Sequence, residues 1–328
     1  TTLIGARRYG DRDGNVGFIL TDSRSLCFPE ETLFFALKSE RNDGHNYIPE
    51  LYRRGVRNFV VSQVPKGYAS DYPEANFLKV VNTLEALQRL AERHRDEFNI
   101  PIVGITGSNG KTMVKEWLHQ LLSPSMFVTR SPRSYNSQIG VPLSVWLLNE
   151  QTQVGVFEAG ISQPGEMLAL RDIIQPTIAV LTYLGAAHQE NFESLEAKCR
   201  EKIILFHDAD TIVYNGDDKT VSGVVNEYKD YKGEKLFWSF RDTKAPFFVK
   251  NVEKKGNLSI ITYIYKGEED SYSLPFIDEA SVTNSIIAAV VSRRLGLSAE
   301  ELDKRMALLE PVAMRLEVKE GQHGCTLI

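Results

Sequence analysis

The sequence Gly104-Ile105-Thr106-Gly107-Ser108-Asn109-Gly110-Lys111-Thr112 decides how the middle of this chain folds. Residues 100–105 are mostly apolar, and the apolar residues of 113–122 recur at the spacing of one helix face. The segment is therefore predicted to form a strand, a glycine-rich loop and a helix. Backbone N–H groups of such a loop, together with the N-terminus of the helix, favour phosphate oxygens.

The loop residues take separate roles if the ligand is a nucleoside triphosphate. Lys111 is expected to reach the β- and γ-phosphates, and Thr112 to offer an oxygen to Mg²⁺. The residues expected to surround the phosphates are Gly107, Ser108, Asn109 and Gly110. The spacing departs from the general P-loop pattern, because five residues rather than four separate Gly104 from Gly110. A glycine-rich turn that binds nothing is the alternative, but Gly-Lys-Thr at a helix start has few structural uses.

The composition is that of a protein with two or three domains. Of the 328 residues, 42% are hydrophobic and 25% are charged, which is enough for a sizeable core. The net charge of −5 disfavours a nucleic-acid partner, since binding nucleic acid requires a basic surface. The apolar runs are too short to span a bilayer and residues 1–8 lack the core of a signal peptide, so a cytoplasmic monomer with no membrane partner is expected. The three cysteines stand far apart, which suggests neither disulfides nor a zinc site.

Residues 1–98 are predicted to form a small α/β domain. Its short β-type runs lie at 17–20, 32–37 and 58–61, with one helical stretch at 48–54. Apolar residues at helical spacing in 83–98 predict a helix that leads to the glycine-rich segment. The domain boundary is placed near Asn99.

Residues 99–311 are predicted to form a second α/β domain around a parallel sheet. Its apolar strands, at 154–157, 178–181 and 211–214, are separated by helical segments. Residues 235–276 differ, because β-type runs at 236–238, 247–249 and 260–265 are joined by turn-like sequences. This pattern predicts an antiparallel meander, followed by a helix over 282–295.

Three side chains outside the loop are candidates for the same site. Glu158 directly follows the strand at 154–157, so its carboxylate is expected at the sheet edge that carries the loop, where it could ligate Mg²⁺. His188 lies in the loop after the next strand and would face the same crevice. Each of these two alone is more simply a solvated acid or an ordinary loop histidine, and their shared placement at strand ends favours a site. Lys202 lies in a charged helical run that is usually a solvated face, and an unmodified lysine would repel Mg²⁺.

These motifs resemble the Mur ligase family, the ATP-dependent amide-forming enzymes of peptidoglycan synthesis. The family form Thr-Gly-Ser/Thr-Asn-Gly-Lys-Thr is present at 106–112 and accounts for the unusual spacing. The segments 107–116, 135–143 and 187–195 are most similar to the subtype that adds D-alanyl-D-alanine. The N-terminal segments 22–24, 33–37 and 43–45 resemble the family's UDP-sugar-binding domain, so the resemblance runs the length of the chain.

The resemblance implies a role for each matched residue. Lys111 and Thr112 would hold the ATP phosphates and one Mg²⁺. Glu158 would ligate that ion, and His188 a second. Lys202 matches the lysine that the family carbamylates, which would turn a cation into an anionic oxygen ligand. The remaining matches are Asn136 at the reacting phosphate, Asn284 at the adenine or ribose, Arg315 at the nucleotide, and Ser23, Arg24, Asp43 and His45 at the UDP-linked substrate.

The implied reaction is an amide ligation. The γ-phosphoryl group of ATP would pass to the terminal carboxylate of UDP-N-acetylmuramoyl-tripeptide, and the amine of D-alanyl-D-alanine would attack the acyl phosphate. Two departures from the family stand out. Ala280 and Ser281 occupy positions where many members have His-Asn, and the chain stops at Ile328, where the third, Rossmann-like domain has barely begun over 312–328. The chain is therefore interpreted as a fragment that is not expected to be active alone.

Other interpretations stay open at the level of sequence. One is the sister ligase that adds a diamino acid to UDP-N-acetylmuramoyl-dipeptide, and another is a folylpolyglutamate-type ligase. The fragment could also be a module that only binds the UDP-substrate and ATP. A P-loop switch or motor is disfavoured, because Glu158 stands where such proteins usually carry an aspartate. Either lysine or diaminopimelate fits as the third peptide residue, and a fused alanine racemase could follow the ligase.

Overall fold

The computed structural model describes residues 2–187, 189–229, 231–312, 319–320 and 326–327. The chain divides into two compact units, Thr1–Phe98 and Asn99–Ile328. Each unit buries its own set of apolar side chains. Within the described ranges no helix combines the length and the apolar composition needed to cross a membrane.

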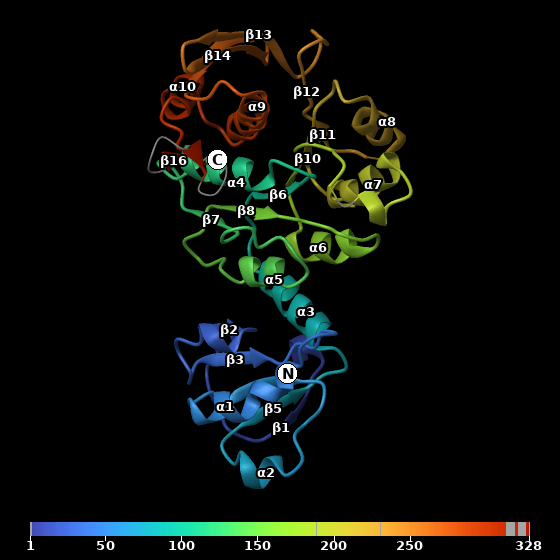
Figure 1. The fold of residues 1–328 in the computed structure, drawn as a ribbon, viewed down its shortest axis with the longest axis vertical. Helices are drawn as coiled ribbons and strands as arrows, with labels where there is room; N and C mark the ends of the chain where they lie inside the picture. Colours follow the sequence, from blue (N-terminus) through green and yellow to red (C-terminus); the bar gives the residue numbers. More distant parts are fainter. Residues whose placement is uncertain (1, 188, 230, 313–318, 321–325, 328) are drawn as a thin grey trace. The chain divides into compact units, whose positions relative to one another are not determined.

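The N-terminal unit is a five-stranded sheet in the order β1-β5-β4-β3-β2 (Figure 1). The strands are β1 (Arg7–Tyr9), β2 (Phe18–Leu20), β3 (Thr32–Phe35), β4 (Asn58–Val61) and β5 (Asn76–Lys79). β1 pairs antiparallel with β5, whereas all other neighbours are parallel. The α/β class predicted for this part of the chain is confirmed, but β1 and β5 were not predicted, because they are short and carry charged or polar residues.

Both faces of this sheet are covered by helices. Alternate residues of β3 and β4 pack toward α1 (Ile48–Arg53) on one face and toward α3 (Thr83–Arg95) on the other. Their continuous apolar sequences follow from this double coverage. α3 begins where the Asn82 side chain accepts the N–H of Leu84 (2.9 Å), an ordinary N-cap. The short helix α2 (Tyr68–Asp71) adds aromatic contacts to the α1 face.

The second unit is built on a six-stranded parallel sheet in the order β11-β10-β9-β6-β8-β7. The strands are β6 (Ile102–Thr106), β7 (Val128–Arg130), β8 (Val154–Glu158), β9 (Ile178–Leu181), β10 (Thr211–Val213) and β11 (Glu234–Lys235). β8 and β9 flank β6, with Ile105 beside Glu158 and Thr106 beside Leu181. The carboxyl ends of these three strands therefore meet at one edge of the sheet, where ligands of such sheets bind.

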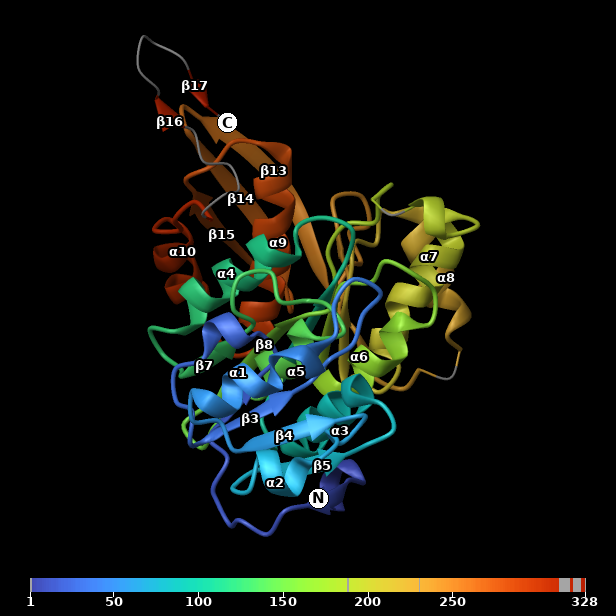
Figure 2. The ribbon, with the colours of Figure 1, turned by 60° about the horizontal axis from the view of Figure 1, so that its bottom comes forward.

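Helices cover both faces of this sheet as well (Figure 2). α4 (Lys111–Leu122) and α9 (Glu279–Arg294) lie on one face, and α5 (Gly140–Val145) and α6 (Glu166–Ile174) lie on the other. α7 (Leu195–Lys202) packs against α8 (Lys219–Glu227) near β10. α9 is buried on most of its circumference because α4 and the central sheet lie on one side of it and a second sheet on the other.

The second sheet corrects one sequence prediction. Its order is β12-β13-β14-β15, with β12 (Trp238–Ser239), β13 (Phe247–Lys255), β14 (Leu258–Tyr265) and β15 (Glu268–Leu274). Only β13 to β15 form the predicted antiparallel meander. The run at 236–238 instead continues parallel to β10, because the Leu236 N–H bonds Ile212 O (2.9 Å). β12 then pairs parallel with β13 and links the two sheets.

The chain that follows α10 (Ala299–Met306) is tied back to α4. The indole of Trp117 is fully buried, and its Nε1 donates to the carbonyl of Glu310 (3.2 Å). Gln120 accepts the N–H of the same residue (2.9 Å). β16 (Lys319–Glu320) and β17 (Thr326–Leu327) pair antiparallel, and the assignment of 312–328 to a third domain stays a prediction.

The packing of α4 can be tested with one truncation. Leu118 of α4 is fully buried in the apolar core that α4 shares with α9. Leu118→Ala should therefore lower the free energy of unfolding by about 2–5 kcal/mol. Leu308→Ala is the matched control, because Leu308 is 77% exposed and should cost less than about 0.5 kcal/mol. Urea unfolding followed by circular dichroism measures both, and equal costs would contradict the described core.

Candidate functional site

The glycine-rich loop turns sharply between β6 and α4. Gly107 has a φ of 146° and Gly110 a φ of 88°, which residues with a Cβ rarely adopt. A Cβ on Gly107 would lie 2.0 Å from Thr182 Oγ1. A Cβ on Gly110 would lie 2.4 Å from Asn284 Oδ1. The loop therefore requires glycine at both positions, for conformation and for space.

Gly110 is the N-cap of α4 and has no side chain to bond the first N–H groups of that helix. Those groups, at the positive end of the helix dipole, are suited to an anion. Lys111 adds charge at the same place. Its Nζ donates to the carbonyl of Gly107 (2.8 Å) and to that of Ser108 (3.4 Å).

The loop is fastened to the segment that follows β9. The N–H of Ser108 donates to Tyr183 O (2.6 Å), and its hydroxyl exchanges hydrogen bonds with the backbone of Gly185 (3.1 and 3.0 Å). The hydroxyl of Thr182 donates to Asn109 O (2.5 Å). The N–H and the hydroxyl of Ser108 are thus both engaged in holding the loop, a role that the motif alone did not indicate.

Glu158 ends β8 and is fully buried beside the loop. Its Oε2 accepts hydrogen bonds from Thr112 Oγ1 (3.1 Å) and from Asn136 Nδ2 (3.3 Å). Its Oε1 lies 3.0 Å from Lys115 Nζ. A buried carboxylate stays ionised only when its charge is compensated in this way. The Thr112 hydroxyl and the Glu158 carboxylate together are hard oxygen donors, which suit Mg²⁺ next to a phosphate.

Lys202 reaches the same loop from the end of α7. It is 2% exposed, and its Nζ donates to the carbonyl of Gly107 (3.4 Å). Burial lowers the pKa of Lys202 to about 7, with further lowering by the positive charges of Lys111 and Lys198. A large share of this amine is therefore neutral, and so nucleophilic, near neutral pH.

Lys198 lies one turn before Lys202 on α7 and is also buried. Its Nζ donates to the carbonyls of Gly185 and Ala187, and burial lowers its pKa. Because Gly185 is bonded to Ser108 as well, Lys198 helps to fix the segment on which the glycine-rich loop is docked.

Asn284 lies against the end of the loop. Its Nδ2 is 3.2 Å from Met113 Sδ, and its Oδ1 faces Gly110. Ser281 gives its N–H to the Asp278 cap of α9 (2.8 Å). His188 and Arg315 lie outside the described residues.

The N-terminal candidates belong to the other unit and form two local networks. Asp22 accepts hydrogen bonds from the side chain and the backbone of Arg24, which lower the pKa of Asp22 to about 2. The backbone carbonyl of Ser23, between them, accepts from Arg54 (2.9 Å). These contacts shape the 22–24 turn.

The second network contains His45. Asp43 Oδ1 lies 2.6 Å from His45 Nδ1, and this bond lowers the pKa of Asp43. His45 Nε2 accepts the backbone N–H of Ser62 (3.0 Å), so Nδ1 carries the proton when the ring is neutral. Both ring nitrogens are therefore engaged within the unit.

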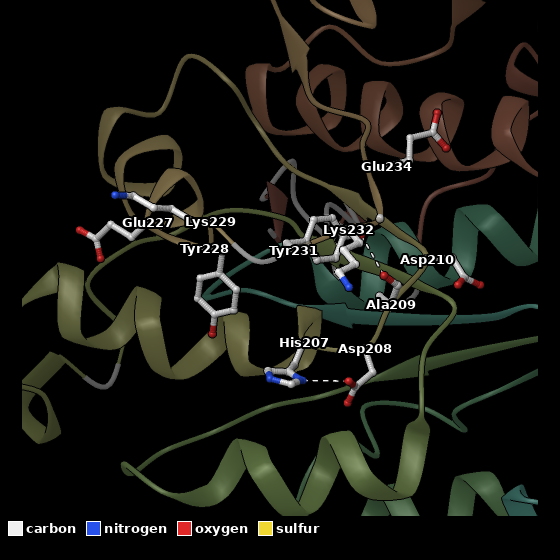
Figure 3. Close-up of a pocket in the computed structure, with 11 residues that line it drawn as sticks. His207, Asp208, Ala209, Asp210, Glu227, Tyr228, Lys229, Tyr231, Lys232 and Glu234 are labelled. Carbon is white, nitrogen blue, oxygen red and sulfur yellow. Dashed lines mark hydrogen bonds and ion pairs between the residues drawn. The ribbon is translucent and has the colours of Figure 1, made fainter.

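A cavity of about 970 Å³ opens elsewhere on the second unit (Figure 3). It is lined by His207, Asp208, Ala209, Asp210, Glu227, Tyr228, Lys229, Tyr231, Lys232, Gly233 and Glu234. Asp210 and Gly233 immediately precede β10 and β11, so the cavity lies at the amino ends of the strands, opposite the glycine-rich loop. Its charges are mixed, and the described residues hold no cluster of three or more acidic, histidine or cysteine side chains able to bind a metal.

The structure thus gathers most of the predicted central residues around one loop. Those that meet there are Lys111, Thr112, Asn136, Glu158, Lys202 and Asn284. Sequence reasoning missed Lys115, Ser134 and Lys198 as site residues. No signal in the sequence singled out Lys115, because Glu116, His119 and Gln120 of the same helix are polar as well.

Two family models match this chain. Residues 105–292 match the "Mur ligase middle domain", and residues 15–95 match "Mur ligase family, catalytic domain". The chain belongs to the Mur ligase family. Within this Mur ligase, the matched middle domain contains every described side chain gathered at the glycine-rich loop.

Similar proteins agree with this assignment. The chain is 28% identical over 319 residues to "UDP-N-acetylmuramoyl-tripeptide--D-alanyl-D-alanine ligase" of Bacillus subtilis, covering 94% of this chain and 65% of that protein. MurF from Acinetobacter baumannii shares the fold, with a TM-score of 0.83 at 24% identity over 93% of this chain and 65% of that one. MurF ligase from Thermotoga maritima, solved in complex with ADP, matches with a TM-score of 0.80 at 25% identity over 93% and 68%. This Mur ligase chain therefore spans slightly less than two thirds of the Bacillus protein.

The fit of the loop predicts a specific cost for adding one methyl group. Gly107→Ala should lower the free energy of unfolding by about 1–3 kcal/mol from backbone strain, and further through the overlap with Thr182. Gly256→Ala separates the two effects, because Gly256 has a φ of 61° but nothing within 4 Å of an added Cβ. Urea unfolding measures both, and a Gly107→Ala cost no larger than that of the control would show that the loop is not tightly docked.

The low pKa of Lys202 predicts an unusual labelling profile. Competitive acetylation of Lys202 with labelled acetic anhydride should rise with pH up to about 7 and then level off, whereas a lysine in a short reference peptide, with a pKa of about 10.4, should continue to gain reactivity at higher pH. Peptide mass spectrometry provides the ratio at each pH. Lys198→Met should move the Lys202 midpoint to higher pH, because it removes a nearby positive charge. A Lys202 profile that parallels that of the reference peptide would exclude the buried, charge-crowded environment.

Proposed function

We propose that this chain provides the UDP-substrate and ATP sites of a ligase that joins D-alanyl-D-alanine to UDP-N-acetylmuramoyl-tripeptide. The observation that carries the proposal is the convergence, in a Mur ligase family member, of Lys111, Thr112, Glu158 and Lys202 on one glycine-rich loop. The name of the Bacillus subtilis relative states the same substrates.

In this proposal the loop holds the triphosphate of ATP. The uncapped N–H groups at the start of α4 and the ammonium group of Lys111 face the phosphate oxygens. The terminal carboxylate of the tripeptide attacks the γ-phosphorus, the bond to the ADP oxygen breaks, and an acyl phosphate forms. Lys111 screens the anions that must approach each other in this step.

The acyl phosphate then reacts with the amine of D-alanyl-D-alanine. The nitrogen bonds to the carbonyl carbon, the carbon–oxygen bond to phosphate breaks, and the amine loses a proton. Phosphate is a far better leaving group than an oxygen of the free carboxylate, which is why the reaction consumes ATP. The side chain of Asn136, bonded to Glu158, is placed beside the reacting phosphate in this arrangement.

Two Mg²⁺ ions are proposed for this site, and the described oxygen donors fit the first of them. Thr112 and Glu158 would hold one, because their oxygens already lie 3.1 Å apart in a buried position, and His188 with Lys202 would hold the second. Bound Mg²⁺ supplies charge neutralisation on the phosphates. All other contributions described for this site come from residues of the chain.

We further propose that Lys202 is carbamylated. The neutral amine would attack the carbon of CO₂, form an N–C bond and lose a proton, leaving an anionic carbamate. Burial and the positive charges of Lys111 and Lys198 favour the neutral amine before the reaction, and the same two positive charges favour the anion after it. Carbamylation would give Lys202 a negatively charged oxygen ligand in place of an amine that can carry positive charge beside Lys111 and Lys198.

The UDP-linked substrate is assigned to the N-terminal unit. The turn at 22–24 and the segment at 43–45, each held by its own hydrogen bonds, carry the residues proposed for this role, namely Ser23, Arg24, Asp43 and His45. Because both His45 nitrogens are engaged, its proposed contribution is to shape the site together with Asp43.

The proposal predicts that Lys111→Ala abolishes acyl-phosphate formation. In the full-length protein with UDP-N-acetylmuramoyl-tripeptide, ATP and D-alanyl-D-alanine, phosphate release should fall at least about 100-fold, since charge stabilisation at the phosphates is lost. Calorimetric binding of the UDP-substrate should stay within about threefold of wild type, because its site lies in the other unit.

Lys254→Ala, at an exposed lysine, is the matched control and should leave phosphate release unchanged. Unchanged turnover by Lys111→Ala would refute the assignment of the loop. Replacing D-alanyl-D-alanine by a diamino acid with the dipeptide substrate, or by glutamate with a folate, tests the sister ligases. Faster turnover with either would change the substrate class while keeping the ligase chemistry.

A further inference from the structure

Lys115 is a charged residue in the most deeply buried stretch of α4. It lies three residues after Thr112 and is 0% exposed. Its helix neighbours Val114, Trp117 and Leu118 are apolar and equally buried. A lysine in such surroundings requires partners that hold its charge, and those partners reveal what it supports.

Four oxygen atoms surround the ammonium group of Lys115. Nζ lies 3.0 Å from Glu158 Oε1 and 3.0 Å from Glu116 Oε1. It also donates to the carbonyl of Ser131 (2.9 Å) and to that of Arg133. One side chain therefore connects α4, the end of β8 and the segment that follows β7.

That segment, residues 131–136, carries two side chains of the proposed site. Ser134 Oγ lies 3.4 Å from Thr112 Oγ1, and Asn136 Nδ2 lies 3.3 Å from Glu158 Oε2. Within the segment, Arg133 has a φ of 48°, a left-handed backbone conformation that is costly for residues other than glycine. Because Lys115 binds the Arg133 carbonyl, it stabilises the turn that brings Ser134 and Asn136 to the site.

The two oxygens of Glu158 are used differently. Among the described residues, Oε1 accepts no hydrogen bond of good geometry and its close charged contact is the ion pair with Lys115 Nζ at 3.0 Å, whereas Oε2 accepts hydrogen bonds from Thr112 and Asn136. The ion pair therefore sets the rotation of the carboxylate. It keeps Oε2 on the side of the glycine-rich loop.

We propose that Lys115 is a positioning residue of the metal–nucleotide site, which clamps the backbone at Ser131 and Arg133 and aims Glu158 Oε2 at the cation that accompanies bound ATP. This inference rests on the proposed function, because it takes the loop to be the site of Mg²⁺-ATP. Lys115 acts through Glu158 and the 131–136 segment. Loss of the Lys115 side chain should weaken binding of the cation more than binding of the nucleotide.

Calorimetric titration of ATP, in EDTA and in excess Mg²⁺, tests this in residues 1–328. Mg²⁺ should tighten ATP binding to the wild type. In Lys115→Met that gain should shrink about 10- to 100-fold, the effect typical of residues that orient metal ligands. Affinity in EDTA should change less than about threefold, since Lys111 and the loop remain. The control is Thr129→Val on β7, the strand that precedes the 131–136 segment. It removes a buried hydrogen bond between Thr129 and Thr152 (2.8 Å), so it should lower thermal stability but keep the Mg²⁺-dependent gain in ATP affinity.

The backbone clamp has its own readout in the exposed Arg133. Glu158→Gln and the double variant Lys115→Met/Glu158→Gln both lack the buried carboxylate charge, so they differ only in Lys115 and avoid the unpaired charge that could unfold Lys115→Met. Trypsin under native conditions should cut after Arg133 at least about tenfold faster in the double variant than in Glu158→Gln.

The two experiments have distinct negative outcomes. If folded Lys115→Met gained as much ATP affinity from Mg²⁺ as the wild type, the positioning role would be overturned. A larger gain would also overturn it, because it would show that Lys115 competes with the cation for Glu158. Equal tryptic rates in Glu158→Gln and the double variant would overturn the clamp. Failure of the wild type to bind ATP with or without Mg²⁺ would instead refute the proposed function, while the tryptic comparison would still decide the clamp.

Discussion

A carboxylate shielded from water at the end of β8 constrains the rest of the second unit. Glu158 is fully buried, and the cost of removing such a charge from water greatly exceeds what one hydrogen bond returns. The surrounding structure meets this requirement from two sides, with the ammonium of Lys115 at one oxygen and the donors of Thr112 and Asn136 at the other. A buried charge kept under these conditions is better explained by chemistry than by stability, because an apolar pair would fill the same space at lower cost.

Sheet topology explains why so few contacts assemble the site. β6 lies between β8 and β9, so the glycine-rich loop after β6 has a carboxylate on one side and the Thr182 segment on the other. The loop is docked through Ser108 and Thr182, and Lys202 approaches Gly107 from α7. Residues distant in the sequence therefore meet because three neighbouring strands end at one edge.

The sequence was sufficient where a strong pattern coincided with a strand end. Glu158 was found because it directly follows a buried run, and the glycine-rich loop was found because its glycines, lysine and threonine have few other uses. Lys115 was not found, since helical spacing cannot show which polar position faces a buried carboxylate. The strand at 236–238 was predicted to be antiparallel, because an apolar triplet does not encode its partner, and Leu236 in fact bonds β10. Short polar strands such as β1 gave no signal that distinguished them from loops, whereas α10 was missed although Ser298 and Glu301 form a capping box at its start.

Both backbone groups of Glu310 are bonded to α4, one through Trp117 and one through Gln120. Trp117 lies six residues after Lys111, or about 9 Å along the helix axis. The backbone of Glu310 is therefore anchored to the same helix whose first turn carries Lys111 and the end of the glycine-rich loop.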